Sequence, residues 1–310
     1  MSTTALLLCG SLACSAGPTG GIVVGGSATI SSPSSSPMTL IINQTSQNAI
    51  INWNSFNIGT GETVKFIQPN SSSISLDRVT GVGVSTINGT LTANGNVFLI
   101  NPNGVLIGPG GVINTAGFVA TTSNIKNSDF MAGRHNFGIA GRPDASVVNL
   151  GRITAANSGF AALVAPGVRN SGTITANLGT VALASGNTFT LDLYGDKLIQ
   201  LAPGDAIAKK VIDVATGKPL SALVGNDGAI KANGGRIQLI ATPRARLSIR
   251  SSIIPASSKP TRSARGPARS CLALRQPRAS RRVPQPKLSG SPARSPQAAR
   301  ARAARAAQSG

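Results

Sequence analysis

The residues on which most enzymes depend are scarce in this chain. Its 310 residues include one His, His135, and nine Asp or Glu. A single His excludes a zinc site built from several His residues. Nine acids leave few candidates for the paired carboxylates of a glycosidase or for a calcium cluster. We therefore predict no catalytic residue, no metal and no cofactor, although the sequence leaves a Ser/His/Asp arrangement open.

The few acids that could act together have unfavourable positions. Asp192 and Asp213 are 21 positions apart, close to the repeat length described below, but they fall in or beside a segment where the repeat is lost. Asp192 and Asp196 flank a charged turn, so we expect both to be solvated. The lone Trp53 stands among apolar residues, which favours a core position over a ligand-stacking one.

Cysteine is absent from residues 15–270. A secreted protein without disulfides has either a sufficient core or a reason to avoid them, such as export in an unfolded state. Residues 1–16 hold a short apolar run followed by small residues, which favours an export signal over a membrane span. No Lys or Arg precedes this run, so the signal is either weak or truncated at its start. The alternatives are an apolar first strand, or lipid modification at Cys14 after a weak lipobox.

Acidic residues are also absent from residues 244–310, which carry 16 Lys or Arg. Residues 1–243 carry 13 Lys or Arg and nine acids, so the high isoelectric point describes the tail alone. Residues 243–310 lack apolar periodicity, and we predict a disordered tail. Its charge could attract nucleic acid, but it has no aromatic residue for stacking bases, so we expect no specific nucleic-acid partner. We prefer a frameshift as its origin, because its Arg, Ala, Pro, Ser and Gly come largely from GC-rich codons; a genuine basic tail is the alternative.

A recurring phrase dominates the remainder of the sequence. It occurs at residues 88–95, 149–155, 170–177 and 226–234, and its central copies at Gly151 and Gly172 are 21 positions apart. Short units that cannot bury an apolar face alone must stack on copies of themselves. Alternation within each copy predicts strands, and we expect Gly and Asn to supply left-handed corners. One apolar residue in each copy should point inward: Leu91, Ile153, Ile174 and Ile230.

These features predict an all-β chain with one domain at residues 17–242. We expect an N-terminal β cap within residues 17–80, including strands near residues 25–30 and 38–44, because an open solenoid end exposes strand edges. Repeats should occupy residues 81–240. Two interruptions, at about 120–148 and 188–222, break the period and should form loops or hairpins outside the solenoid.

Four segments carry a family resemblance: residues 51–59, 61–66, 76–81 and 95–105. In this order they resemble the N-terminal two-partner secretion domain, or haemagglutination activity domain, of filamentous haemagglutinins. The resemblance covers residues 20–240. It implies a right-handed parallel β-helix, Sec-dependent export to the periplasm, and recognition by a dedicated outer-membrane transporter through its periplasmic domains and barrel.

The family carries two short Asn-Pro-Asn motifs. The second matches here as Asn101-Pro102-Asn103-Gly104, and Gln68-Pro69-Asn70 stands at the degenerate first. Pro fixes φ, Asn bonds neighbouring backbone and Gly permits positive φ, so the second motif prescribes a turn. These seven residues are our candidates for transporter recognition. The motif is either a structural corner or a direct contact, and one role does not preclude the other.

The leading functional hypothesis is a non-enzymatic secretion and adhesion module, monomeric and exported to the bacterial cell surface. The resemblance places adhesion, haem acquisition, cytolysis or toxin delivery, and contacts with host-cell or glycan surfaces, in a full-length form. One alternative is a β-helical carbohydrate-active enzyme, which clustered carboxylates in a cleft would favour. A further alternative is a nucleic-acid-binding protein acting through its basic tail.

Overall fold

The computed structural model describes residues 17–193, 199–202, 207, 210–241 and 247–249. The expected export signal at residues 1–16 and most of the predicted disordered tail, from residue 250 onward, lie outside the described residues. Within that predicted tail, residues 247–249 instead form a strand that pairs in parallel with residues 224–226, so the boundary predicted at residue 242 is wrong. The described chain is nearly all β, as predicted, with one short helix, α1 (Asn127–Met131). No helix among the described residues is long and apolar enough to cross a membrane.

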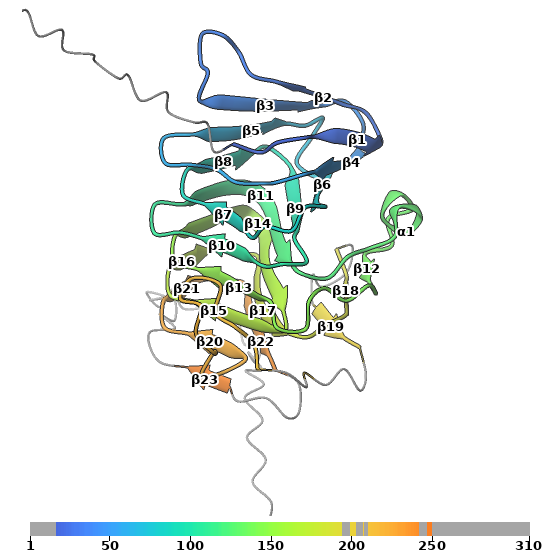
Figure 1. Ribbon diagram of the computed structural model, residues 1–310. Helices are drawn as coiled ribbons and strands as arrows, with labels where there is room; N and C mark the ends of the chain where they lie inside the picture. Colours follow the sequence, from blue (N-terminus) through green and yellow to red (C-terminus); the bar gives the residue numbers. More distant parts are fainter. Residues whose placement is uncertain (1–16, 194–198, 203–206, 208–209, 242–246, 250–310) are drawn as a thin grey trace, which may run out of the picture. The chain divides into compact units, whose positions relative to one another are not determined.

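Successive turns of the chain stack in parallel and form three rows of strands (Figure 1). Face A consists of β3 (Thr39–Gln44), β5 (Thr63–Ile67), β8 (Thr90–Ala93), the first halves of β11 (Val112–Thr121) and β14 (Arg152–Ala165), β16 (Thr173–Thr175) and β21 (Ala229–Lys231). Face B consists of β4 (Asn48–Trp53), β6 (Ile74–Val79), β9 (Asn96–Ile100), the second halves of β11 and β14, β17 (Thr180–Ser185) and β22 (Arg236–Ile240). Face C consists of β7 (Ser85–Ile87), β10 (Val105–Ile107), β13 (Ser146–Asn149), β15 (Gly167–Asn170), β20 (Val224–Asn226) and β23 (Leu247–Ile249).

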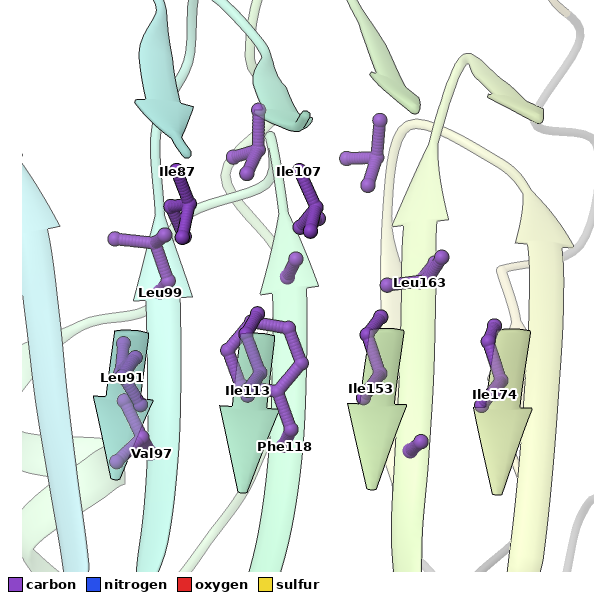
Figure 2. Packing of buried hydrophobic residues seen from close by; sticks show 14 of the residues in the cluster. Ile87, Leu91, Val97, Leu99, Ile107, Ile113, Phe118, Ile153, Leu163 and Ile174 are labelled. Carbon is purple, nitrogen blue, oxygen red and sulfur yellow. The ribbon is translucent and has the colours of Figure 1, made fainter. Parts of the chain in front are cut away.

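The interior is built from apolar residues that stack from one coil to the next. On face A the strand registers align six of them in one column: Val64, Leu91, Ile113, Ile153, Ile174 and Ile230. Each is at most 1% exposed. Figure 2 shows four residues of this column, Leu91, Ile113, Ile153 and Ile174, beside residues from the other faces, such as Leu99 and Ile107. The inward position predicted for the four repeat residues is therefore confirmed.

The Asn and Gly residues of the repeat act differently from the prediction. Gly151, Gly172 and Gly228 are not among the residues with positive φ. They lie where coils approach closely: a Cβ on Gly172 would stand 2.1 Å from the carbonyl oxygen of Gly151, and one on Gly228 equally close to that of Gly172. Only glycine fits at these three positions, so close packing rather than a left-handed backbone explains them. Gly234, at the end of the last copy, has φ +69° and does supply a left-handed corner as predicted.

The repeat asparagines form a buried ladder beside these glycines. Asn149 Nδ2 donates to Asn170 Oδ1 at 2.7 Å, and Asn170 Nδ2 donates to Asn226 Oδ1 at 2.7 Å. All three side chains are at most 1% exposed. Stacked amides satisfy one another inside the coil, where an unpaired amide would be costly.

The N-terminal cap is smaller than expected. β1 (Ile22–Gly25) pairs antiparallel with β4, and β2 (Ala28–Ser31) pairs antiparallel with β3, so the cap strands cover the first edges of faces A and B. Parallel stacking already begins where β3 pairs with β5. The boundary predicted near residue 81 is therefore wrong, because the first coils keep the apolar alternation but lack the Asn and Gly phrase.

The two interruptions meet on the outside of face B. β12 (Asn136–Phe137) from the first pairs with β18 (Phe189–Leu191) from the second, and β18 pairs with β19 (Ile199–Leu201). This antiparallel sheet covers a second apolar cluster centred on Phe98, whose ring lies 6.2 Å from that of Phe137. Both interruptions were predicted to leave the solenoid, but their pairing was not.

The apolar column yields a stability prediction. Replacing Ile174 by Asp should lower the free energy of unfolding by roughly 4 kcal/mol, because it removes buried apolar surface and places a charge in a dry stack. Thr175→Asp, on the neighbouring outward position, is the matched control and should change the value by less than about 0.5 kcal/mol. Urea unfolding followed by circular dichroism measures both. Equal losses would show that the register is wrong.

Candidate functional site

The Asn101-Pro102-Asn103-Gly104 motif forms the corner between β9 on face B and β10 on face C. Asn101 is fully buried, and its Oδ1 accepts the Asn103 backbone N–H at 2.9 Å. The Gly104 N–H donates to the Asn101 carbonyl at 3.0 Å, which closes a four-residue turn. Gly104 has φ +119°, a region that favours glycine. The turn expected from the motif, including the positive φ of Gly104, is therefore confirmed.

The two asparagines of the motif also hold a loop of the preceding coil. Asn101 Nδ2 donates to the Gly83 carbonyl at 2.9 Å, and Asn103 Nδ2 donates to the Gly81 carbonyl at 3.0 Å. Between these anchors, Val82 is 94% exposed. The sequence analysis did not single out Val82. The only available signal was a valine between two glycines, which alone does not indicate a loop that exposes an apolar side chain.

A cavity of about 250 Å³ lies beside the motif. Its lining includes Asn103, Arg142, Asp144 and Ser146. The Arg142 N–H donates to the Pro102 carbonyl at 3.1 Å, and the Arg142 side chain pairs with Asp144 at 2.9 Å. The first interruption thus returns to the solenoid directly against the motif and supplies a charged rim.

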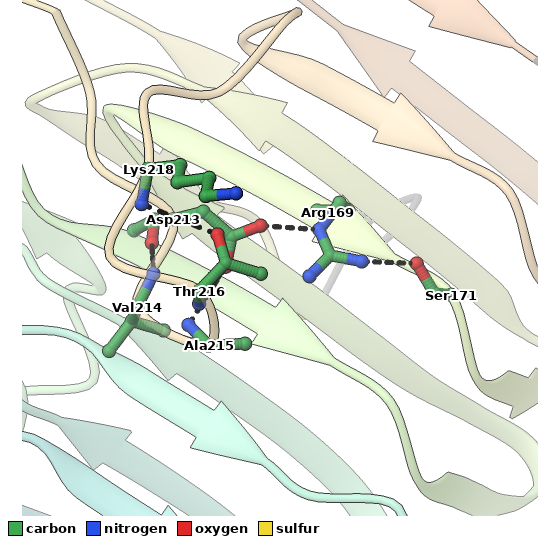
Figure 3. Close-up of polar contacts among 8 residues, drawn as sticks. Arg169, Ser171, Asp213, Val214, Ala215, Thr216 and Lys218 are labelled. Carbon is green, nitrogen blue, oxygen red and sulfur yellow. Dashed lines mark hydrogen bonds and ion pairs between the residues drawn. The ribbon is translucent and has the colours of Figure 1, made fainter.

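The cavity is also lined by residues of a loop that Asp213 fixes. Figure 3 shows the polar contacts of Asp213 in this loop. The buried Asp213 carboxylate accepts from Arg169 Nε at 2.7 Å and from the Ala215 N–H at 2.8 Å. Arg169 Nη1 also donates to Ser171 Oγ at 2.6 Å. Asp213, weighed in the sequence as a partner for Asp192, is therefore committed to anchoring this loop on face C.

Gln68-Pro69-Asn70 lies at a different corner, between β5 on face A and β6 on face B. Gln68 is 5% exposed; its Nε2 donates to Gln44 Oε1 at 3.0 Å, and its Oε1 accepts the Gly95 N–H at 3.0 Å. Pro69 and Asn70 are exposed. The buried Gln68 fills the corner, so only Pro69 and Asn70 offer accessible surface among the degenerate motif residues.

Two titratable groups are buried away from both corners. Asp77 points into the solenoid, where Trp53 Nε1 donates to it at 2.9 Å and Ser75 Oγ at 2.8 Å. Burial raises the pKa of Asp77 to about 7. His135 packs against Phe98 and Phe130 in the second apolar cluster, and burial lowers its pKa to about 4. Trp53 is 1% exposed, so its predicted core position is confirmed.

The arrangement offers little to a metal. Among the residues that the structure describes, no three His, Cys, Asp or Glu side chains gather in a way that could hold an ion. The fold and site together define a class of protein: a nearly all-β domain of stacked parallel coils with a hydrogen-bonded Asn-Pro-Asn-Gly corner.

Comparison with known proteins identifies the family. The family model described as the TPS secretion domain matches residues 25–266, and the chain belongs to this family. TPS secretion domains are the secretion domains of two-partner exoproteins, so the resemblance seen in the sequence is confirmed. The comparisons favour neither a carbohydrate-active enzyme nor a nucleic-acid-binding protein.

Individual relatives support the same assignment. The chain is 38% identical over 221 residues to a heme/hemopexin-binding protein of Haemophilus influenzae, a match that covers 69% of this chain and 23% of that protein. The solved HMW1 secretion domain of Haemophilus influenzae is 34% identical, with a TM-score of 0.61, and the match covers 73% of this chain and 57% of that one. The filamentous hemagglutinin secretion domain, at 14% identity and a TM-score of 0.51, matches over 73% and 79% of the two chains and shares the fold.

The two buried titratable groups yield a prediction on pH. The raised pKa of Asp77 makes its contribution to stability largest below pH 4 and removes it as the pH rises to about 7, a change of up to about 4 kcal/mol. The lowered pKa of His135 acts in the opposite sense, because its contribution is present above about pH 6.5 and is lost as the pH falls to about 4, by up to about 3 kcal/mol. The wild-type stability should therefore change little between pH 4 and 7.

Single variants should separate the two contributions. In Asp77→Asn the stability should rise with pH between 4 and 7, because the contribution of His135 is no longer offset. In His135→Gln it should fall over the same range, because the contribution of Asp77 is no longer offset. Urea unfolding at several pH values measures both. Profiles parallel to the wild type in both variants would contradict the burial of these groups in the folded state.

Proposed function

We propose that this domain is the export address of a two-partner exoprotein and that its outer-membrane transporter recognises the corner at residues 101–104 with the loop at residues 81–84. The observation that carries the proposal is the pair of Asn side chains that hold the Val82 loop. An exposed valine on an anchored loop loses little conformational freedom on binding and offers apolar surface to a partner. Pro69 and Asn70 form a secondary contact at the neighbouring corner.

The folded state in this proposal is a right-handed parallel β-helix, reached after passage through the periplasm to the cell surface. The parallel registers of faces A, B and C and the likeness to solved secretion domains support it. Residues 1–16 would supply the export signal.

We further propose that the domain is non-enzymatic and serves as the head of an adhesin. Five of the described acids have structural partners: Asp77 bonds Trp53, Asp213 pairs with Arg169, and Glu62 Oε2 accepts the Gly59 N–H at 2.7 Å. Asp129 and Asp144 pair with neighbouring arginines. The matched part of the chain spans 23% of the length of the heme/hemopexin-binding relative. The activity of a longer exoprotein is therefore a separate question from recognition of this domain by a transporter.

A secretion assay of the full chain, co-expressed with its cognate transporter, tests the address. Val82→Ser should lower secretion about tenfold, because an apolar side chain buried in a contact contributes about 1.5 kcal/mol or more. The stability of the purified chain should change by less than about 0.5 kcal/mol, since this side chain is exposed. Leu178→Ser, which removes another exposed aliphatic side chain, is the control and should secrete normally.

The buried residue of the motif should behave differently. Asn101→Ala should lower both stability and secretion, because it removes the bonds that close the corner and hold the Gly83 carbonyl. Normal secretion of Val82→Ser together with impaired secretion of Asn101→Ala would mean that the motif is only a structural corner.

A further inference from the structure

The outward side of face A carries two regular rows of side chains, ten of which are polar or charged. The registers align Thr63, Thr90, Val112, Arg152, Thr173 and Ala229 in the first row. They align Lys65, Thr92, Asn114, Thr154, Thr175 and Lys231 in the second. The two rows flank the buried apolar column, and all twelve side chains are half-buried or exposed. We call this surface the face A ladder.

Strand stacking makes the ladder periodic. Neighbouring strands lie about 4.8 Å apart, so each row presents a side chain at that interval along the stack. Thr is the commonest residue in both rows, and β-branched side chains on a sheet have few rotamers. The ladder is therefore an ordered strip of hydroxyl groups that can donate and accept hydrogen bonds without large losses of side-chain entropy.

The charge on the ladder has one sign. Its ionisable residues are Lys65, Arg152 and Lys231, and neither row contains an acid. None of these three cations takes part in the ion pairs found among the described residues, which are Arg134–Asp129, Arg142–Asp144 and Arg169–Asp213. Arg152 lies three strands from Lys65 and two strands from Lys231, which corresponds to about 14 Å and about 10 Å along the stack.

The other two faces are covered on the outside. The sheet of β12, β18 and β19 lies over the apolar outer side of face B. On face C, Val211 and Leu220 come close to Gly167, and the loop between them is anchored by the Arg169–Asp213 pair. The face A ladder is thus the sheet surface that the insertions leave accessible, within the part of the chain that the structure describes.

We propose that the face A ladder binds a linear anionic polysaccharide that runs along the stack, across the strands. Such a polymer repeats sugar hydroxyls at short intervals and acidic groups at longer ones, which matches closely spaced Thr side chains and widely spaced cations. A nucleic acid fits less well, because neither row has an aromatic side chain on which a base could stack. The proposal assigns a glycan contact to this domain itself and does not depend on recognition by the transporter.

Lysine acetylation of the full chain, with and without heparin, tests the ladder residue by residue. Retention of the whole chain on a heparin column would also depend on residues 244–310, which carry 16 basic side chains. Mass spectrometry instead measures the acetylation of each lysine separately. Lys65 and Lys231 should be protected about fivefold, as a direct charge contact would give. Lys126 and Lys218, which are exposed outside the ladder, should be protected less than about twofold by screening alone. Equal protection of all four lysines would overturn the proposal.

A pair of variants separates hydroxyl contacts from charge. Thr92→Val with Thr175→Val keeps the shape and strand propensity but removes two hydroxyls, and it should reduce the protection of Lys65 and Lys231 at least about twofold. Asn114 stays unchanged in this variant, because its replacement by Val would alter the shape of the side chain as well as its polarity. Unchanged protection in the threonine variant would mean that charge alone holds the polymer and would overturn the ladder as a glycan site. The proposal would also be overturned if single-stranded DNA of equal charge protected Lys65 and Lys231 from acetylation as strongly as heparin does.

Discussion

Each coil of this domain must lie directly on the previous one, because its strands complete their hydrogen bonds only with the coils on either side. This constraint fixes the register of all three faces and therefore aligns like positions in columns. The column from Val64 to Ile230 is one consequence. The asparagine ladder of Asn149, Asn170 and Asn226 is another, since each of these buried amides bonds the amide at the same position of an adjacent coil. The repeat glycines are a third, because a Cβ at Gly172 would collide with the backbone of the preceding coil.

The parts of the fold that follow from local alternation could be predicted from the sequence. Period-two alternation places Ile174 inside and Thr175 outside whatever lies above and below. The same holds for the turn at residues 101–104, because Pro, Asn and Gly determine a turn through their own backbone preferences. The beginning of the stack at Thr39 could not be read in this way, since the first coils keep the alternation without the Asn and Gly phrase that marks the later ones.

Features that depend on contacts between distant segments were not predictable. Phe137 and Phe189 stack with ring centroids 4.4 Å apart. They lie in different interruptions, and nothing in the local sequence of either residue indicates that the two pack together. Val82 is exposed because asparagines from the following coil hold the carbonyls on either side of it. The role of Gly151, Gly172 and Gly228 could not be predicted for the same reason: glycine permits both positive φ and close approach, and the neighbouring coil decides which one is used.

A structural corner and a recognition element are not competing roles in this architecture. Asn101 is buried, so a partner cannot read its side chain directly, but that side chain decides where residues 81–84 lie. A motif can therefore be required for recognition although the partner touches what the motif holds rather than the motif itself. The same logic separates the faces. Insertions cover the apolar outer side of face B and, on face C, surround the Arg169–Asp213 pair, whereas face A presents hydroxyls and cations that form no ion pair with the residues described. The shared register decides which side chains each coil presents on each face. The chemistry of these side chains thus determines which faces of the solenoid remain accessible to partners.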